Sequence, residues 1–152
     1  MTYEGVKRMS RIVLAAAALG FVITAPVAQT DPIQARQALM KENGNQGKAA
    51  TEMIEGKRPF SLDDAKKVFA AFIEAGEKAP AFFPEDSKEG KTAALPAIWQ
   101  NKEDFNARLA KLATDSKAAS EASKDLDSFK AQMSIVGKNC GGCHELYRRK
   151  RT

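Results

Sequence analysis

The sequence predicts an all-α protein, an antiparallel four-helix bundle that follows a short processed segment. From Gln29 onward the apolar residues recur three and four positions apart, which is the period of an amphipathic helix, and no stretch alternates as a strand does. Capping residues, glycines and prolines divide this pattern into four long segments. The chain has 152 residues, 43% hydrophobic and 28% charged, which suits one globular domain with a packed core.

Residues 1–28 are typical of a secretory signal peptide. Three basic residues precede the apolar run 12–23, which is short for a bilayer span, and small residues follow as far as Ala28. We expect cleavage after Ala28, which leaves residues 29–152 as the mature domain; an uncleaved membrane anchor is the alternative. Because residues 1–28 hold three basic residues and one acidic residue, their removal lowers the net charge from +5 to +3. This mild excess does not indicate a nucleic-acid partner.

The first helix is expected to begin with Thr30 or Asp31 as its cap, because Pro32 follows. Proline has no backbone N–H, and the N–H groups of the first helical turn have no partner within the helix. Gly44 and Gly47 weaken its middle by about 1 kcal/mol each relative to alanine, so this helix either kinks or passes close to another group. A glycine and a proline end it, and Ser61 caps the second helix. The expected inward residues are Ile33, Met40, Ala50 and Ile54, then Leu62, Ala65, Phe69, Phe72 and Ile73.

Residues 80–96 form the one long connection, because three prolines and Gly90 interrupt any helix there. The third helix is expected from about Lys102 to Ser120, and the fourth from about Asp125. Their expected inward residues are Phe105, Leu109, Leu112 and Ala119, then Leu126, Phe129, Met133, Val136, Cys140, Cys143 and Tyr147. Two hairpins joined by a longer crossover describe the bundle.

The two cysteines and the single histidine of the chain all fall within the five residues Cys140-Gly-Gly-Cys143-His144. Two thiols one helical turn apart can both form thioethers with the vinyl groups of a haem, and His144 then places an imidazole nitrogen on the iron. The motif therefore predicts one covalently attached haem c.

Other uses of paired cysteines fit the motif less well. A disulfide between Cys140 and Cys143 is the default in an oxidising compartment, and a thioredoxin-like redox pair has the same spacing. Neither explains His144, and a redox pair normally opens a helix that follows a strand. Zinc needs a fourth ligand, and the sequence has no further cysteine or histidine. Since no nucleophile–base pair or carboxylate pair is evident, the sequence does not predict an enzyme.

With this motif on its last helix, the chain resembles the class II c-type cytochromes, which comprise cytochrome c′ and the low-spin cytochrome c556 group. The resemblance covers residues 29–152. It rests on Cys-Gly-Gly-Cys-His with Tyr-Arg-Arg-Lys shortly after it, on Leu-Pro-Ala-Ile-Trp at 95–99, and on Arg-Gln-Ala-Leu-Met-Lys-Glu-Asn-Gly at 36–44. It implies a periplasmic haem bundle with His144 as proximal ligand, the first helix over the distal face, periplasmic redox proteins as partners, and assembly as a homodimer.

The resemblance leaves two states open for the sixth coordination position of the iron. Met40 matches the family position that faces the iron, and its thioether suits a low-spin electron-transfer haem as in c556. A methionine on an inward stripe also serves as ordinary core packing. The Leu-Met-Lys-Glu-Asn-Gly run favours c556, whereas Arg36 favours cytochrome c′, whose open site binds NO or CO. We expect Met40 to ligate the iron of an electron carrier, with the open gas-binding site as the alternative.

The resemblance also implies supporting roles for two arginines. Arg36 matches a family arginine that pairs with a haem propionate, and its alternative is a solvated surface position. Arg148 follows His144 by four residues, so we expect it one turn on and beside the proximal imidazole; an ordinary helix-end cation is its alternative. Trp99 is expected in the core. The basic residues 148–151 are expected to contact an acidic redox partner or simply to end the helix.

Overall fold

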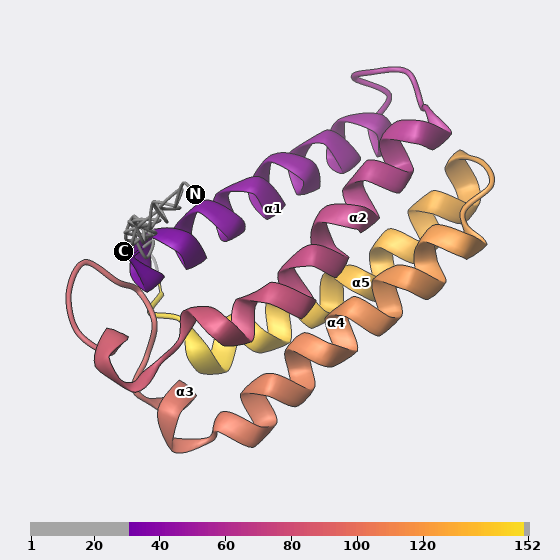
Figure 1. The fold of residues 1–152 in the computed structure, drawn as a ribbon. Helices are drawn as coiled ribbons and strands as arrows, with labels where there is room; N and C mark the ends of the chain where they lie inside the picture. The colour runs from indigo at the N-terminus through magenta and orange to yellow at the C-terminus, as the bar shows by residue number, and fades with distance from the viewer. Residues whose placement is uncertain (1–30, 151–152) are drawn as a thin grey trace, which may run out of the picture.

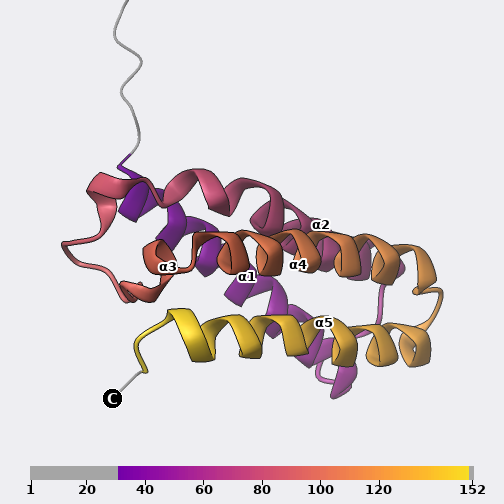
Figure 2. The same cartoon turned by 90° about the horizontal axis from the view of Figure 1, so that it is seen from below.

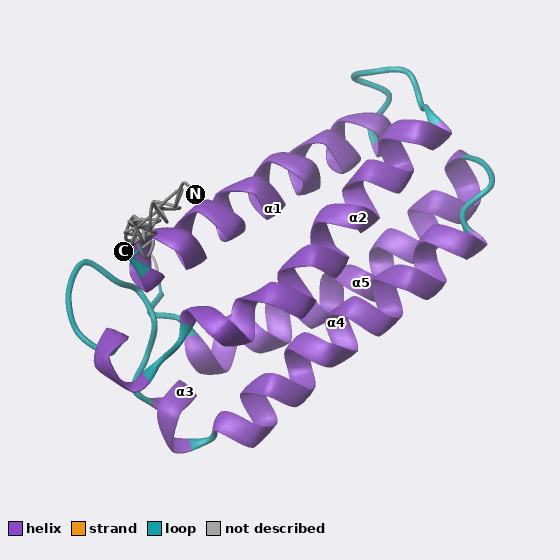
Figure 3. Cartoon of the chain, viewed as in Figure 1, coloured by secondary structure: helices purple, strands orange, loops and turns teal. Residues whose placement is uncertain are grey.

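The computed structural model describes residues 31–150, which form four long helices and a helical connection (Figure 1). The long helices are α1 (Pro32–Ile54), α2 (Leu62–Lys78), α4 (Lys102–Ala122) and α5 (Leu126–Tyr147). The connection between α2 and α4 holds the 3₁₀ turns η1 (Ala79–Phe82) and η2 (Glu85–Ser87) and the short helix α3 (Ala97–Gln100). Within the described range the sole β pairing is one antiparallel bridge between Ala94 and Arg148, so the all-α prediction is confirmed (Figure 3).

The predicted signal peptide lies outside the described residues, so its status as a cleaved segment or an anchor stays a prediction. Between residues 31 and 150, none of the helices combines the length and apolar character that crossing a bilayer requires.

The helix starts follow from local capping, as the sequence predicts. The Asp31 carboxylate accepts a hydrogen bond from the N–H of Ile33 at 2.9 Å, and Ser61 caps α2 through the N–H of Asp64 at 3.3 Å. Asp125 and Ser128 satisfy each other's backbone N–H groups in a capping box at the start of α5. The hydrogen-bonded helix α1 continues unbroken through residues 44–47, so its two glycines do not end it.

The side chains of the bundle pack into two clusters. Figure 2 shows α1 running obliquely across the other long helices. The first cluster is built around the rings of Phe69 and Phe129, whose centroids are 5.5 Å apart, and the second around Phe105 and Tyr147, 5.3 Å apart. Cys140 packs against the first cluster and Cys143 against the second. The haem-attachment motif therefore lies where the two clusters meet.

The predicted core is confirmed on α4 and corrected on α1. All four expected residues of α4 are buried. On α1 the buried hydrophobic residues are Ala50 and Met53, whereas the expected Ile33, Met40 and Ile54 are only half-buried. The oblique course of α1 explains Ile33 and Met40, because only the C-terminal part of α1 lies against the first cluster, whereas Ile54 packs against that cluster from its edge.

Helices α2 and α4 approach each other closely at Gly76. A Cβ atom built on Gly76 would lie 2.5 Å from the carbonyl oxygen of Leu109 and 2.8 Å from the Cβ atom of Ala113. A backbone oxygen cannot turn aside as a flexible side chain can. The absence of a side chain at this position therefore sets the spacing of the two helices.

We predict that Gly76→Ala lowers the free energy of unfolding by about 1–3 kcal/mol, although alanine is the better helix former, because the added methyl group forces α2 and α4 apart. Chemical denaturation of the haem-loaded protein measures the change. Gly141→Ala is the matched control, since this exposed glycine of α5 has no atom within 4 Å of an added Cβ. Equal stability of the two variants would contradict the close approach.

Candidate functional site

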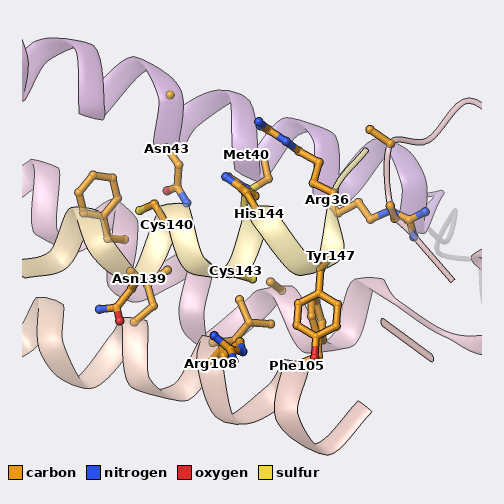
Figure 4. Close-up of a pocket in the computed structure, with 18 of the residues that line it drawn as sticks. Arg36, Met40, Asn43, Phe105, Arg108, Asn139, Cys140, Cys143, His144 and Tyr147 are labelled. Atoms are coloured by element: carbon orange, nitrogen blue, oxygen red, sulfur yellow. The ribbon is translucent and has the colours of Figure 1, made fainter. Parts of the chain in front are cut away.

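A cavity of about 700 Å³ separates the middle of α1 from the C-terminal half of α5 (Figure 4). Its volume lies within the range of roughly 300–1,000 Å³ that is usual for pockets of small molecules and cofactors. We call α1 and the C-terminal half of α5 the two walls of the cavity. The floor between them is apolar and comes from α2, α3, α4 and the early part of α5. Its apolar residues include Phe72, Ile98, Phe105, Leu109, Leu112 and Met133. All six site residues predicted from the sequence line this one cavity; they are Arg36, Met40, Cys140, Cys143, His144 and Arg148.

The two cysteines of α5 are half-buried free thiols. Burial raises the pKa of Cys140, and burial also raises the pKa of Cys143 although the nearby Arg108 lowers it in part. A reactive redox pair needs a lowered thiol pKa and a position at the start of a helix, whereas these thiols lie late in α5. The redox-pair alternative thus finds no support.

A zinc site is equally unsupported. Within residues 31–150, no group of three or more His, Cys, Asp or Glu side chains is placed to hold a metal ion. Zinc in a structural site takes four such ligands.

Met40 and His144 face the cavity from its two walls. In Figure 4 Met40 projects from α1 and His144 from α5 toward the same part of the cavity. Met40 is half-buried and belongs to neither core cluster, unlike Met53 later on the same helix. The core-packing alternative for Met40 is therefore weak, and its thioether is available to a ligand in the cavity.

Gly44 and Gly47 leave room on the α1 wall. A Cβ atom at either position would meet no described atom within 4 Å, so contacts with the protein do not require glycine there. Both residues line the cavity, where the missing side chains leave space for a flat group. Together with two thiols, an imidazole and a thioether on facing walls, this space fits a haem, and it accounts for two helix-weakening residues in α1.

Arg36 links α1 to the connection between α2 and α4. Its side chain is buried, and the guanidinium donates four hydrogen bonds into residues 82–92. Nη1 donates to the carbonyl of Phe82 and the hydroxyl of Ser87, both at 2.9 Å. Nη2 donates to the carbonyl of Ser87 at 2.8 Å and to the hydroxyl of Thr92 at 3.0 Å. The solvated alternative is therefore wrong, and a propionate would meet a guanidinium whose Nη hydrogens already have partners.

Arg148 lies beside the cavity at the end of α5. Helix α5 ends at Tyr147, and Arg148 is extended, with φ −125° and ψ 135°. The N–H of Leu95 donates to the backbone carbonyl of Tyr147 at 3.0 Å, and the N–H of Arg149 donates to the backbone carbonyl of Ala93 at 2.8 Å. After Tyr147 the chain therefore pairs with the connection and no longer continues the helix. The N–H of Arg148 nevertheless donates to the carbonyl of His144 at 3.2 Å, so Arg148 lies one helical turn beyond His144 as predicted, and both residues line the cavity.

The sequence reasoning missed a polar group beside Cys143. The carboxylate of Asp104 accepts hydrogen bonds from Nε of Arg108, at 2.7 Å, and from the hydroxyl of Tyr147. Arg108 and Tyr147 line the cavity. The four-residue spacing of Asp104 and Arg108 on one helix is a recognisable signal, but nothing in the sequence joins them to Tyr147.

We predict that Arg36→Ala lowers the free energy of unfolding by about 2–4 kcal/mol, because the buried oxygens of residues 82–92 lose their donor. Urea denaturation of the haem-loaded protein measures the loss. Gln37→Ala is the control, since this exposed neighbour donates a single hydrogen bond, to the carbonyl of Lys91. Similar losses for both variants would show that Arg36 does not hold the connection in place.

We predict that Tyr147→Phe raises the pKa of Asp104, which hydrogen bonds from Arg108 and then from Tyr147 now lower. The stability that this carboxylate contributes is present above its ordinary pKa of about 3.9 and is lost as the pH falls through the lowered value. The variant should therefore start to lose this contribution at a higher pH. Titration of Asp104 followed by NMR tests this, and an unchanged titration would contradict it.

Three comparisons with known proteins agree with this geometry. A family model described as Cytochrome C′ matches residues 31–148. A cytochrome c′ of Rhodopseudomonas palustris is 42% identical over 127 residues, which is 83% of this chain and 87% of the relative. A cytochrome c-556 of the same organism is 32% identical over 147 residues, 93% of this chain and 99% of the relative. The solved structure of cytochrome c′ from Rhodopseudomonas palustris superposes with a TM-score of 0.78 at 41% identity, covering 82% of this chain and 100% of that one.

Proposed function

The chain belongs to the cytochrome c′ family, and we propose that it is a periplasmic electron carrier whose single haem iron is held by His144 and Met40. As a haem c protein of this family, it has in Cys140 and Cys143 the two thiols for covalent attachment. We infer that α5 holds the haem through both cysteines and His144, while α1 covers the opposite face.

The observation that carries this proposal is the placement of Met40 opposite the Cys-Gly-Gly-Cys-His segment across one cavity. A thioether is a soft ligand, and paired with a histidine it favours a low-spin iron. Ligands from two packed helices keep their positions when the charge on the iron changes. Little reorganisation then accompanies gain or loss of an electron, which suits a carrier.

The haem supplies a one-electron iron couple when bound, and the chain controls the surroundings of that couple. The apolar floor from α2, α3 and α4 gives the cavity surroundings of low polarity. Low polarity around the site makes each fixed charge near it more effective. Arg108 is such a charge, beside Cys143 and paired with Asp104. In this proposal the protein positions, covers and electrostatically tunes its cofactor, and turns over no organic substrate.

A second candidate function is that of a cytochrome c′ with an open distal site that binds NO or CO. The comparisons give it a specific basis, because the identity to the cytochrome c′ relative is 42% and that to the cytochrome c-556 relative is 32%. In this case Met40 lines the site without binding the iron, and the gas molecule binds the iron on the α1 side of the cavity. The two candidates differ only in what Met40 does.

We propose the periplasm as the location, on the strength of the predicted signal peptide in residues 1–28, and redox proteins with an acidic surface as partners. Arg149 and Lys150 are exposed next to the cavity residue Arg148, and within the described part of the chain neither forms an ion pair. Cations at such an edge attract an acidic partner, and salt weakens that attraction. We also expect a homodimer, as the family resemblance implies.

We predict that the native protein has a low-spin reduced spectrum that CO does not change, and that Met40→Ala converts it into a form that binds CO. Optical spectra of oxidised and reduced protein, with and without CO, make the test. Met133→Ala is the matched control, because Met133 lines the same cavity but packs against the first core cluster.

A native protein with a high-spin spectrum that shifts with CO would overturn Met40 ligation and establish the open site instead. If Met133→Ala bound CO and Met40→Ala did not, the sixth ligand would be Met133 and not Met40.

A further inference from the structure

Three polar side chains join the start of α4 to the end of α5 beside Cys143. One oxygen of the Asp104 carboxylate, Oδ2, accepts a hydrogen bond from Nε of Arg108 at 2.7 Å and another from the hydroxyl of Tyr147. Asp104 and Arg108 belong to α4, whereas Tyr147 is the last residue of α5. A single oxygen atom therefore connects a cation on one helix to a hydroxyl on the other.

Tyr147 is the fixed member of this group. It is only 6% exposed, and its ring packs edge to face against that of Phe105, with the centroids 5.3 Å apart. The side chains of Asp104 and Arg108 are instead 51% and 38% exposed. An exposed ion pair is held loosely, because fixing two long side chains costs conformational entropy. The buried hydroxyl restricts the carboxylate, and the carboxylate in turn restricts Nε of Arg108.

The guanidinium of Arg108 is held next to the haem-attachment motif. Its Nη1 atom lies 3.8 Å from a Cβ atom built on Gly142, which directly precedes Cys143. Arg108 lines the cavity, whereas Asp104 does not. Figure 4 shows Arg108 and Tyr147 on the same side of α5 as Cys143. The positive member of the ion pair is thus the one that faces the space for the cofactor.

We propose that Tyr147 and Asp104 are positioning residues that hold the charge of Arg108 beside the Cys143 end of the haem, where it raises the reduction potential of the iron. Reduced iron carries one positive charge less than oxidised iron, so a fixed cation nearby favours the reduced form. The inference rests on the proposed function for its haem. It applies to both candidate functions, because it concerns the side of the haem that is bonded to α5.

Removing one cation at a time from α4 tests the effect of the charge. The experiment compares haem-loaded Arg108→Met with haem-loaded Lys111→Met by optical titration of the iron in an electrochemical cell. Both substitutions change the net charge equally, and each removes the partner of a carboxylate four positions away, Asp104 or Asp115. Lys111 does not line the cavity, so it is the matched control.

We expect Arg108→Met to lower the ratio of reduced to oxidised protein at a fixed electrode potential about fivefold. At about 59 mV per tenfold change for a one-electron couple, this equals about 40 mV. Lys111→Met should change the ratio by less than about twofold, because solvent and salt screen its exposed charge. Arg108→Lys keeps the charge and should recover part of the loss.

Tyr147→Phe tests the positioning, because it changes no charge and keeps the buried ring. Without the hydroxyl, the carboxylate and the guanidinium are free to move toward solvent, and the charge of Asp104 loses a hydrogen-bond donor. Both changes weaken the positive field at the haem. We therefore expect the reduced-to-oxidised ratio to fall about twofold, with an optical spectrum that matches the native one.

Equal shifts in Arg108→Met and Lys111→Met would overturn the effect of Arg108 on the potential, and an unchanged potential in Tyr147→Phe would overturn its positioning. Both results come from haem-loaded protein, so they would leave the proposed function intact. A native protein that carries no haem at Cys140 and Cys143 would instead overturn the proposed function, and this inference with it.

Discussion

The separation of the middle of α1 from α5 is the constraint on which the rest of the structure depends. A cavity of about 700 Å³ between two helices must be framed by elements that hold their positions without contact across it. At one end of α1, Ala50 and Met53 are buried in the first core cluster. At the other end, Arg36 donates into the connection through both Nη atoms. Helix α1 is thus held in place near both of its ends, while its middle borders the cavity.

The connection between α2 and α4 shapes the other end of the cavity. Nε1 of Trp99 donates to the carbonyl of Pro84 at 3.0 Å, and Nζ of Lys102 donates to that of Phe83 at 2.7 Å, so the segment is folded on itself. Its last part pairs with the backbone beside Arg148 and ends α5 at Tyr147. This one connection therefore holds the N-terminal part of α1 through Arg36 and also determines where α5 ends.

The sequence predicted what depends on near neighbours and missed what depends on distant ones. Helix caps, the breaks at prolines and the Cys-Gly-Gly-Cys-His motif are local signals. From them the four helices and the wall of the site formed by the last helix could be predicted. The partners of Arg36 lie 46 to 56 residues away, and no periodicity announces them. The bridge between Ala94 and Arg148 at the end of α5 also joins residues far apart in the sequence.

The division of the core into two clusters gives the cofactor a mechanical meaning. Cys140 packs against one cluster and Cys143 against the other, so a haem bonded to both sulfur atoms, as we propose, would join the two halves of the core. Loss of either thioether bond would then weaken the link between the halves. In that arrangement the cofactor would serve the framework of the bundle as well as its chemistry.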